Sequence, residues 1–325
     1  MKNKNKFNWG IIGCGAVTEI KSGPAFQKTD GFHLTAVMRR DGSLAKDYAQ
    51  RHGVEKYYSN ADDIINDDSI DAIYIATPPD THKLYGLRVA EAGKTCCIEK
   101  PLAPTYQDCK TILNAFEKSQ APLFVSYYRR SLPRFNKIKL LLDSGEIGEV
   151  RHITWHLNKA VNQIDLSQDY NWRTDKAIAA GGYFDDLASH GLDLFAYLLG
   201  DFETVKGIGI NQQNLYSAFD AVSACWTHEK RITGAGSWNF GGFSRKDKVT
   251  IYGNEGEISF SVFDEEPISL ISATKQKQMH IENPTNIQLH HVQNMQEQLV
   301  SGKQHPSNGV TATHTSWVME QILER

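Results

Sequence analysis

The fold is decided by the stretch Phe7-Asn8-Trp9-Gly10-Ile11-Ile12-Gly13-Cys14-Gly15-Ala16-Val17-Thr18. Its apolar first half predicts a buried strand, and its glycines predict a tight turn that opens a helix. Gly13 allows the turn, Gly15 lets the backbone approach a pyrophosphate, and the first N–H groups of the helix favour negative charge. We therefore expect Gly13, Cys14, Gly15, Ala16 and Val17 to bind a dinucleotide. The alternative is a plain glycine turn, and Thr18 is larger than the usual Gly or Ala.

A second strand, predicted over residues 34–39, ends at Arg39-Arg40-Asp41. An acidic side chain at this point accepts hydrogen bonds from the adenosine ribose of NAD, whereas arginine matches the 2′-phosphate of NADP. Because Arg39 holds the usual acidic position, NADP is favoured, with Arg40 beside it. Asp41 lies two residues later and keeps NAD open as an alternative. The structural alternative is a solvated turn, because exposed arginines are common.

Strand and helix patterns then alternate to about residue 125. Helices are predicted over 42–52, 61–66, 83–92 and 106–119, and strands over 70–77, 95–98 and 122–128. The loop after the strand 70–77 brings Thr77, Pro78 and His82 to the carboxyl edge, where they are candidates to wall the nicotinamide side. His82 is an equal candidate for capping the helix 83–92.

The strand Thr95-Cys96-Cys97-Ile98 delivers Glu99-Lys100-Pro101 to the same edge. Open α/β sheets bind ligands outside the carboxyl ends of their strands, so Lys100 is the residue most expected to do chemistry, with Glu99 beside the cofactor. The plain alternative is a surface lysine in a turn, since lysine is almost always exposed. Residues 1–125 thus predict a Rossmann doubly wound sheet of the α/β class, and 126–325 a second domain.

From about residue 149 the apolar pattern changes to a period of two. Strands are predicted over 150–157, 205–210, 218–227, 232–238, 248–252 and 257–262. Few crossovers separate them, so we expect a largely antiparallel open sheet of the α+β class, with one face covered and the other free. A broad free face favours a homo-oligomer. The terminal helix, from about Thr311, is expected to pack on the first domain. The histidines of the C-terminal part are expected at the surface or in linkers: His290, His291, His305 and His314.

One long helix in this second part carries a polar stripe. Asp186, His190, Asp193 and Tyr197 fall at i, i+4, i+7 and i+11, so Asp186 is placed to orient the imidazole of His190. The alternative is an ordinary solvated helix face. We predict no metal site, because one histidine with carboxylates is a poor zinc set.

These motifs resemble the Gfo/Idh/MocA oxidoreductases, the glucose-fructose oxidoreductase and inositol dehydrogenase family. The resemblance rests on Gly13-Cys14-Gly15, Ala76-Thr77-Pro78 with His82, Glu99-Lys100-Pro101, Gly145-Glu146-Ile147-Gly148 and the Gly181-Gly182 turn before Asp186 and His190. It implies that Asp186 and His190 face the substrate with Lys100, and that the protein forms homodimers or homotetramers through the second sheet. Ala180 and Ala188 depart from the glycines of the family pattern, so the position of this helix relative to the substrate is expected to differ from that pattern.

The chemistry implied is oxidation of a secondary alcohol of a sugar, polyol or inositol. His190 is the expected base and Lys100 stabilises the developing alkoxide, or the two exchange these roles. Tyr127, Trp172 and Arg173 are weaker candidates for substrate binding, weighed against plain packing. Two other functions stay open, a non-catalytic NAD(P)-dependent sensor or regulator and an NAD-dependent glycosidase.

Charge and cysteine content limit the partners and the location of the protein. Among 325 residues, 35 Lys and Arg against 38 Asp and Glu give a net charge of −3, which offers no reason to expect nucleic acid or an anionic membrane as partner. The five cysteines are odd in number and show no CxxC spacing, which favours a reduced, cytoplasmic setting.

Overall fold

A computed structural model describes residues 5–324 and divides into two compact units. Unit 1 comprises the chain up to Leu132 together with Pro284–Thr313, and unit 2 comprises Pro133–Asn283 with the chain from His314 onward. The sequence predicted a single boundary near residue 125. The chain instead returns to unit 1 after the second sheet is complete, and its last helix begins in unit 1 and ends in unit 2.

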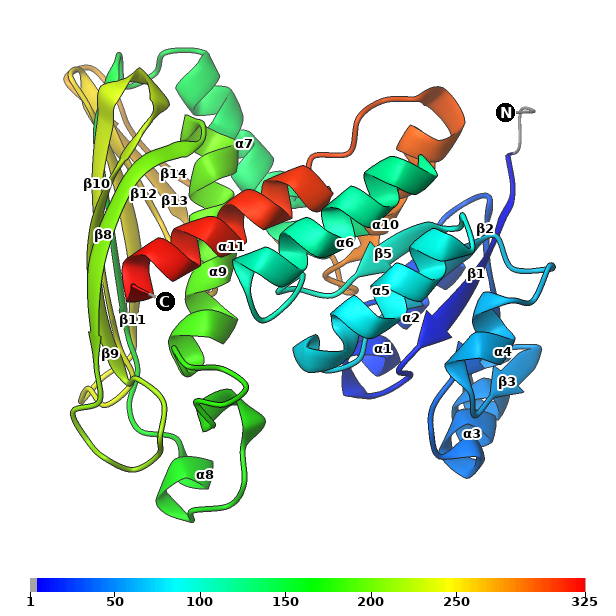
Figure 1. Ribbon diagram of the computed structural model, residues 1–325. Helices are drawn as coiled ribbons and strands as arrows, with labels where there is room; N and C mark the ends of the chain where they lie inside the picture. The colour runs from blue at the N-terminus through cyan, green and yellow to red at the C-terminus, as the bar shows by residue number, and fades with distance from the viewer. Residues whose placement is uncertain (1–4, 325) are drawn as a thin grey trace. The chain divides into compact units, whose positions relative to one another are not determined.

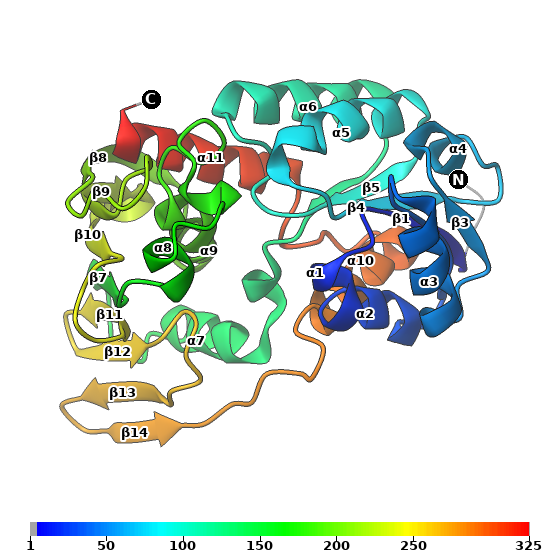
Figure 2. The same ribbon diagram turned by 90° about the horizontal axis from the view of Figure 1, so that it is seen from below.

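Unit 1 contains a parallel sheet of six strands in the order β3-β2-β1-β4-β5-β6 (Figures 1 and 2). The strands are β1 Phe7–Ile12, β2 Phe32–Met38, β3 Lys56–Tyr58, β4 Ala72–Ile75, β5 Thr95–Ile98 and β6 Leu123–Val125. This order is that of a Rossmann fold, whose strand order reverses between β1 and β4. The predicted class of unit 1 is therefore confirmed.

Helices cover both faces of this sheet, and each face has its own apolar core. On one face lie α4 Ala61–Ile65, α5 His82–Glu91 and α6 Tyr106–Ser119, and on the other α2 Gly23–Lys28, α3 Gly42–His52 and α10 Leu289–Ser301. Cys96 belongs to the first core and Cys97 to the second, as expected of neighbours on a strand. The sheet is thus buried on both faces, as its near-continuous apolar strands require.

Unit 2 contains a sheet of eight strands in the order β14-β13-β12-β11-β7-β10-β9-β8. They are β7 Val150–Asn158, β8 Phe202–Ile210, β9 Ala221–His228, β10 Ile232–Asn239, β11 Lys246–Gly253, β12 Gly256–Phe260, β13 Ile268–Ser272 and β14 Gln276–Met279. Only β7 and β10 pair in parallel, so the predicted antiparallel character is confirmed. The sequence patterns did not predict β13 and β14.

The long helix α9, Tyr183–Leu199, packs on one face of this sheet. Phe195 meets Trp155 edge to face at 5.5 Å between ring centroids, and Phe184 meets Trp238 at 5.0 Å. A Cβ at Gly191 would lie 2.4 Å from the Trp155 ring, so this glycine lets the helix approach the sheet. The opposite face exposes the side chains of Ile208 and Ile210, with exposed fractions of 65% and 46%.

The expectation that His291 and His305 lie at the surface is corrected. His291 lies on α10 and His305 follows it, and both are buried at 1% exposure in unit 1, so they are not surface residues. The first turn of the terminal helix α11, Gly309–Leu323, belongs to unit 1, where Ala312 joins the core, and the rest of the helix belongs to unit 2. Its later residue Ile322 packs against Gly207 of β8 in unit 2.

Candidate functional site

A cleft of about 390 Å³ lies at the carboxyl edge of the parallel sheet in unit 1. The glycine turn, the end of β2 and the loop after β4 form its walls. Seven of the residues predicted to bind cofactor line this one cleft: Gly13, Cys14, Gly15, Arg39, Arg40, Thr77 and Pro78. The structure therefore brings together side chains that are up to 65 residues apart in the sequence.

Gly13 and Gly15 occupy different environments in this cleft. Gly13 has φ of +94°, and a Cβ there would lie 2.7 Å from Thr77 Cγ2, so the fold itself requires glycine. A Cβ at Gly15 would meet only the carbonyl oxygen of Gly13, at 3.9 Å. No packing inside the described chain demands glycine at position 15, and the space in front of its Cα is open to a ligand.

The first turn after the glycines is short and is held by Thr18. Helix α1, Ala16–Ile20, begins with a reciprocal pair in which Thr18 Oγ1 accepts from Gly15 N at 3.0 Å and donates to Gly15 O at 2.8 Å. Thr18 is fully buried, so its greater size is accommodated by these bonds. Ala16 and Val17 are exposed, and N–H groups of a first helical turn have no acceptor within the helix.

Cys14 faces the core with its side chain and the cleft with its backbone. Burial raises the pKa of its thiol to about 11, so the thiol stays protonated at neutral pH. Its carbonyl oxygen lies 3.5 Å from Arg39 Nη1, which places the guanidinium at the mouth of the cleft. Arg39 and Arg40 are both exposed.

Asp41 is engaged as the N-cap of α3. Its Oδ1 accepts from Ser43 N at 2.9 Å, Ser43 Oγ at 2.6 Å and Leu44 N at 3.3 Å. These bonds, with that from the Ser43 hydroxyl foremost, hold the pKa of the Asp41 carboxyl below its ordinary value. A ribose hydroxyl that donates to this carboxylate would therefore share it with the donors at Ser43 and Leu44.

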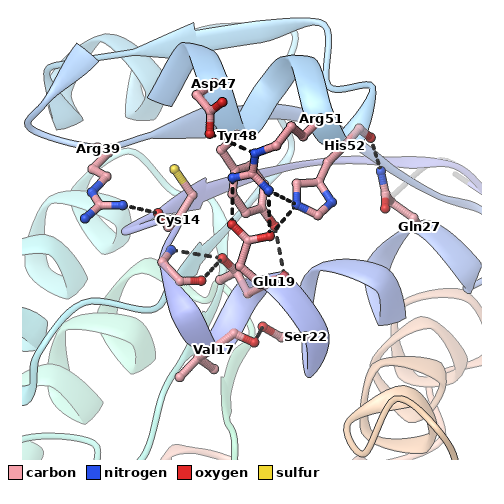
Figure 3. A network of polar contacts seen from close by, with 12 residues as sticks. Cys14, Val17, Glu19, Ser22, Gln27, Arg39, Asp47, Tyr48, Arg51 and His52 are labelled. Atoms are coloured by element: carbon pink, nitrogen blue, oxygen red, sulfur yellow. Dashed lines mark hydrogen bonds and ion pairs between the residues drawn. The ribbon is translucent and has the colours of Figure 1, made fainter. Parts of the chain in front are cut away.

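A network of ion pairs fastens α1 to α3 behind the cleft (Figure 3). Arg51 donates to both carboxylate oxygens of Glu19, at 2.8 and 3.0 Å, and to Asp47 at 2.8 Å. His52 Nε2 lies 2.7 Å from Glu19 Oε2, and Tyr48 donates to Thr18 O at 2.9 Å. Local sequence patterns do not predict this network, because Glu19 and Arg51 lie on different helices and match no motif.

His82 opens α5 and is fully buried. Its Nε2 lies 2.8 Å from Thr77 O and its Nδ1 lies 3.0 Å from Pro101 O. Burial lowers the pKa of the His82 ring, and the two backbone carbonyl oxygens at its nitrogens oppose this shift. His82 thus connects the loop after β4 to the loop after β5 from within, and it does not line the cleft.

Lys100 follows β5 at the carboxyl edge, directly after Glu99. Glu99 is 9% exposed and its Oε1 accepts from Tyr74 Oη at 2.5 Å and from Gln288 Nε2 at 2.8 Å. Its Oε2 accepts from the backbone N–H of Lys100 at 3.2 Å. Glu99 therefore anchors the backbone of Lys100 to unit 1, and the Lys100–Pro101 peptide bond is cis.

In unit 2, α9 carries Asp186 and His190 one turn apart. Asp186 Oδ2 accepts from Arg173 Nε at 2.9 Å, and the Arg173 guanidinium stacks on Trp172 at 4.4 Å. His190 is 5% exposed, and its ring meets Phe263 edge to face at 6.0 Å. Three predicted substrate residues, Trp172, Arg173 and Asp186, thus belong to one cluster.

Other members of the predicted set lie elsewhere. Tyr127 is 2% exposed and lies in the core of unit 1. This position agrees with the alternative of plain packing rather than substrate binding. Further along the stripe of α9, Asp193 accepts from Thr315 of α11 at 3.1 Å, and Tyr197 donates to Asn136 of α7 (Pro133–Asp143) at 2.9 Å. Only the first two members of the stripe, Asp186 and His190, remain as candidates for chemistry.

Within residues 5–324, no cluster of three or more His, Cys, Asp or Glu side chains is arranged to hold a metal ion. Over the same residues, no helix has the length and apolar character needed to cross a membrane.

Comparisons with known proteins agree with this architecture. Residues 7–127 match the oxidoreductase family with an NAD-binding Rossmann fold, and residues 135–259 match the GFO/IDH/MocA C-terminal domain. The chain is 40% identical over 289 residues to Oxidoreductase P35 of Formosa agariphila, covering 88% of both proteins. It is 30% identical over 232 residues to levoglucosan dehydrogenase of Pseudarthrobacter phenanthrenivorans, covering 70% of this chain and 53% of that protein.

A solved structure shares the fold over nearly the whole length. Levoglucosan dehydrogenase in complex with NADH and levoglucosan superposes with a TM-score of 0.87 at 21% identity, covering 98% of this chain and 96% of that one. The resemblance seen in the motifs is therefore confirmed at the level of both domains. The chain belongs to the Gfo/Idh/MocA family of oxidoreductases, and its unit 1 is the NAD(P)-binding Rossmann domain of that family.

Proposed function

We propose that this oxidoreductase transfers a hydride between a nicotinamide dinucleotide and a secondary alcohol or ketone of a sugar, polyol or inositol. The register of the parallel sheet carries this proposal. Ile12 pairs with Ile75, and Ile75 pairs with Ile98, so the glycine turn, the Thr77 loop and Lys100 follow neighbouring strands at one edge. A lysine at this edge, beside a dinucleotide cleft, suits chemistry on the bound cofactor.

The cleft fits a dinucleotide phosphate. The open space before Gly15, the exposed first turn at Ala16 and Val17, and the guanidinium of Arg39 provide room, N–H donors and positive charge. The nicotinamide, when bound, accepts or supplies the hydride. Proton transfer and stabilisation of the charge on the substrate oxygen are the proposed roles of side chains of the protein.

His190 is the proposed proton acceptor for the substrate hydroxyl during oxidation, and the donor during reduction. Asp186, one helical turn before it, stabilises the imidazolium that forms, and Arg173 holds the Asp186 carboxylate in place at 2.9 Å. Lys100 donates a hydrogen bond to the substrate oxygen and stabilises its developing negative charge. In the alternative assignment, Lys100 and His190 exchange their roles as proton acceptor and hydrogen-bond donor. The pH dependence of kcat in Lys100→Ala and in His190→Gln distinguishes the two assignments.

NADP is the proposed cofactor, because Arg39 stands at the end of β2 and Asp41 is engaged in capping α3. The named relatives favour a carbohydrate or polyol substrate. They include levoglucosan dehydrogenase and scyllo-inositol 2-dehydrogenase (NAD(+)) of Bacillus subtilis, the latter 25% identical to this chain.

The test is a turnover assay over a panel of neutral sugars, polyols and inositols, each with NADP and with NAD. We expect substrate-dependent formation of reduced nicotinamide, and a keto sugar or inosose identified by NMR as the product. Cofactor binding with no turnover over the whole panel would contradict the proposal and favour the sensor. Cleavage of a glycoside without net cofactor reduction would favour the glycosidase.

A further inference from the structure

A second pocket, of about 390 Å³, lies wholly within unit 2. One wall is the segment from α8 (Gln163–Leu166, Figure 1) to the short 3-10 helix Trp172–Thr174, and the other is the connection between β8 and β9. Its lining includes Asp165, Tyr170, Asn171, Asp175, Tyr216 and Ser217. None of the residues assigned to the chemistry above lines it.

Asp165 places a buried acceptor against this pocket. The residue is 5% exposed, and its Oδ1 accepts from Tyr183 Oη at 2.9 Å, which in turn accepts from Asn171 Nδ2 at 3.0 Å. Its Oδ2 is buried and has no hydrogen-bond partner within residues 5–324. Burial raises the pKa of the Asp165 carboxyl, although the hydrogen bond from Tyr183 lowers it in part.

Tyr216 places a second such atom on the opposite wall. Its hydroxyl is buried and also has no partner among the described residues, so it does not bond to Asp165. The ring meets that of Tyr183 edge to face at 6.1 Å. Its backbone is fixed, because Asn211 Nδ2 donates to Tyr216 O at 2.6 Å and the neighbouring Ala218 N donates to Thr174 O at 3.2 Å.

Two buried polar atoms without a partner at one pocket point to a ligand or water, because buried polar groups are almost always hydrogen-bonded. A carboxylate oxygen only accepts, whereas the Tyr216 hydroxyl must also donate its proton. An ammonium group would satisfy the carboxylate and leave the Tyr216 proton without an acceptor. A phosphate or carboxylate group would be repelled, since the lining holds Asp165, Asp169 and Asp175 and no Lys or Arg.

Hydroxyl groups suit both atoms in kind, because a hydroxyl can donate, as Asp165 Oδ2 requires, and can also accept, as Tyr216 Oη requires. Neighbouring hydroxyls on one ring offer several such groups, and the aromatic faces of Tyr170 and Tyr216 suit a sugar ring. The pocket also adjoins the proposed chemistry within unit 2, since Asn171 lines it while Arg173, two residues later, bonds to Asp186.

We propose that this pocket is a second carbohydrate subsite, which binds a neutral sugar ring attached to the group that is oxidised. The inference rests on the proposed function, and it specifies an extended substrate, a disaccharide or glycoside, in place of a single ring. The anchoring atoms are Asp165 Oδ2 and Tyr216 Oη.

Tyr216→Phe tests the proposal because it removes only the orphaned hydroxyl. Tyr252→Phe is the matched control, since Tyr252 lies on β11 and does not line the pocket. Binding of neutral monosaccharides (glucose, galactose, mannose and xylose) and of disaccharides built from them is measured by saturation-transfer NMR and calorimetry, with cofactor-dependent kinetics in parallel. Asp165→Asn is a second variant that keeps the acceptor for Tyr183.

We expect wild-type protein to bind a disaccharide more tightly than its monosaccharide, and Tyr216→Phe to lose about tenfold of that affinity, as expected for one lost hydrogen bond. KM for the disaccharide rises by the same factor, while kcat and the monosaccharide KM stay unchanged. Thermal unfolding of Tyr216→Phe is expected at or above the wild-type temperature, because the removed hydroxyl has no partner to lose.

Equal disaccharide binding by wild type and Tyr216→Phe, or no disaccharide binding at all, would overturn the subsite and leave a pocket that holds water only. Tighter binding of amino or phosphorylated sugars than of neutral ones would also overturn it. Turnover of single-ring substrates with no Tyr216 effect refutes the subsite and leaves the proposed function standing. Tyr216-dependent binding without any cofactor reduction refutes the proposed function instead.

Discussion

At the scale of single residues, the two glycines of the first turn are expected to have different roles. Gly13 is required by the fold, whereas Gly15 leaves room for a ligand. The backbone at Gly13 has φ of +94°, and a Cβ at this position would lie 2.7 Å from Thr77 Cγ2, so the fold requires glycine here. Gly15 has an extended backbone and open space where a side chain would stand. The same substitution at the two positions is therefore expected to affect different properties.

Gly13→Ala is expected to destabilise the protein by about 1–3 kcal/mol, because alanine is strained at this φ and contacts Thr77. Gly15→Ala is expected to leave the free energy of unfolding nearly unchanged and to weaken dinucleotide binding. Urea unfolding and fluorescence titration with NADPH measure the two properties. Wild-type affinity in Gly15→Ala would show that the phosphates do not approach this turn.

Arg39 is the residue on which the choice of cofactor depends. Arg39→Asp is expected to abolish the preference for NADPH, because it removes the guanidinium and places an acidic side chain where the ribose of NADH would lie. Parallel fluorescence titrations of wild type and variant with NADPH and NADH measure the change. Tighter binding of NADH by the wild type would make Asp41 the ribose partner and refute the NADP assignment. Lys118→Asp, an exposed substitution at the end of α6 that also changes the net charge by about −2, is the control for charge alone.

At the scale of elements, the Glu19 network holds the glycine turn against α3. The bond from Arg51, more than that from His52, lowers the pKa of Glu19 from 4.5 to about 2. A carboxylate with a lowered folded-state pKa stabilises the protein fully above its unfolded-state pKa, and this contribution disappears as the pH falls toward the folded-state value.

Glu19→Gln is therefore expected to lower the free energy of unfolding by about 1 kcal/mol at neutral pH, the scale of a surface ion pair with ideal geometry. The difference from wild type should hold down to about pH 5 and shrink between about pH 4 and pH 2. Urea unfolding across this range measures it. A difference that is independent of pH throughout would mean that the carboxylate charge does not stabilise the contact between α1 and α3.

How far the sequence predicts the elements depends on the strength of local patterns. The helix α6 agrees with its predicted bounds of 106–119, because Thr105 caps it, accepting from Asp108 N at 3.1 Å, and its apolar residues repeat at helical spacing. The strand β14, Gln-Lys-Gln-Met, was missed because three of its four residues are exposed and polar. This strand forms because it pairs with β13, and such pairing cannot be predicted from the local sequence pattern.

The sites show the same dependence. Gly13, Arg39 and Thr77 could be placed in one cleft, because strand ends of a parallel sheet share an edge. The bond between Gln288 and Glu99 spans 189 residues, and no local pattern predicts it. Asp165 and Tyr216 lie in loop-rich segments without a motif, so only the fold reveals their common pocket.

At the scale of the whole molecule, the residues with proposed chemical roles are distributed over the two units, and the proposed cofactor cleft lies in unit 1. Lys100 follows a strand of unit 1, whereas Asp186 and His190 lie on a helix of unit 2. Variants in either unit should therefore lose turnover while the dinucleotide cleft stays intact. This separation distinguishes an enzyme from a protein that only binds NAD(P).

The most direct measurement is turnover together with NADPH affinity in Lys100→Ala and His190→Gln, using the best substrate of the panel. We predict that each variant loses about 10²–10⁴-fold in kcat, the range for a lost acid-base group, with NADPH affinity within about twofold of wild type. His156→Gln, on the exposed face of β7, is the control and should turn over normally. Wild-type kcat in either variant, or loss of NADPH binding in Lys100→Ala, would contradict the account.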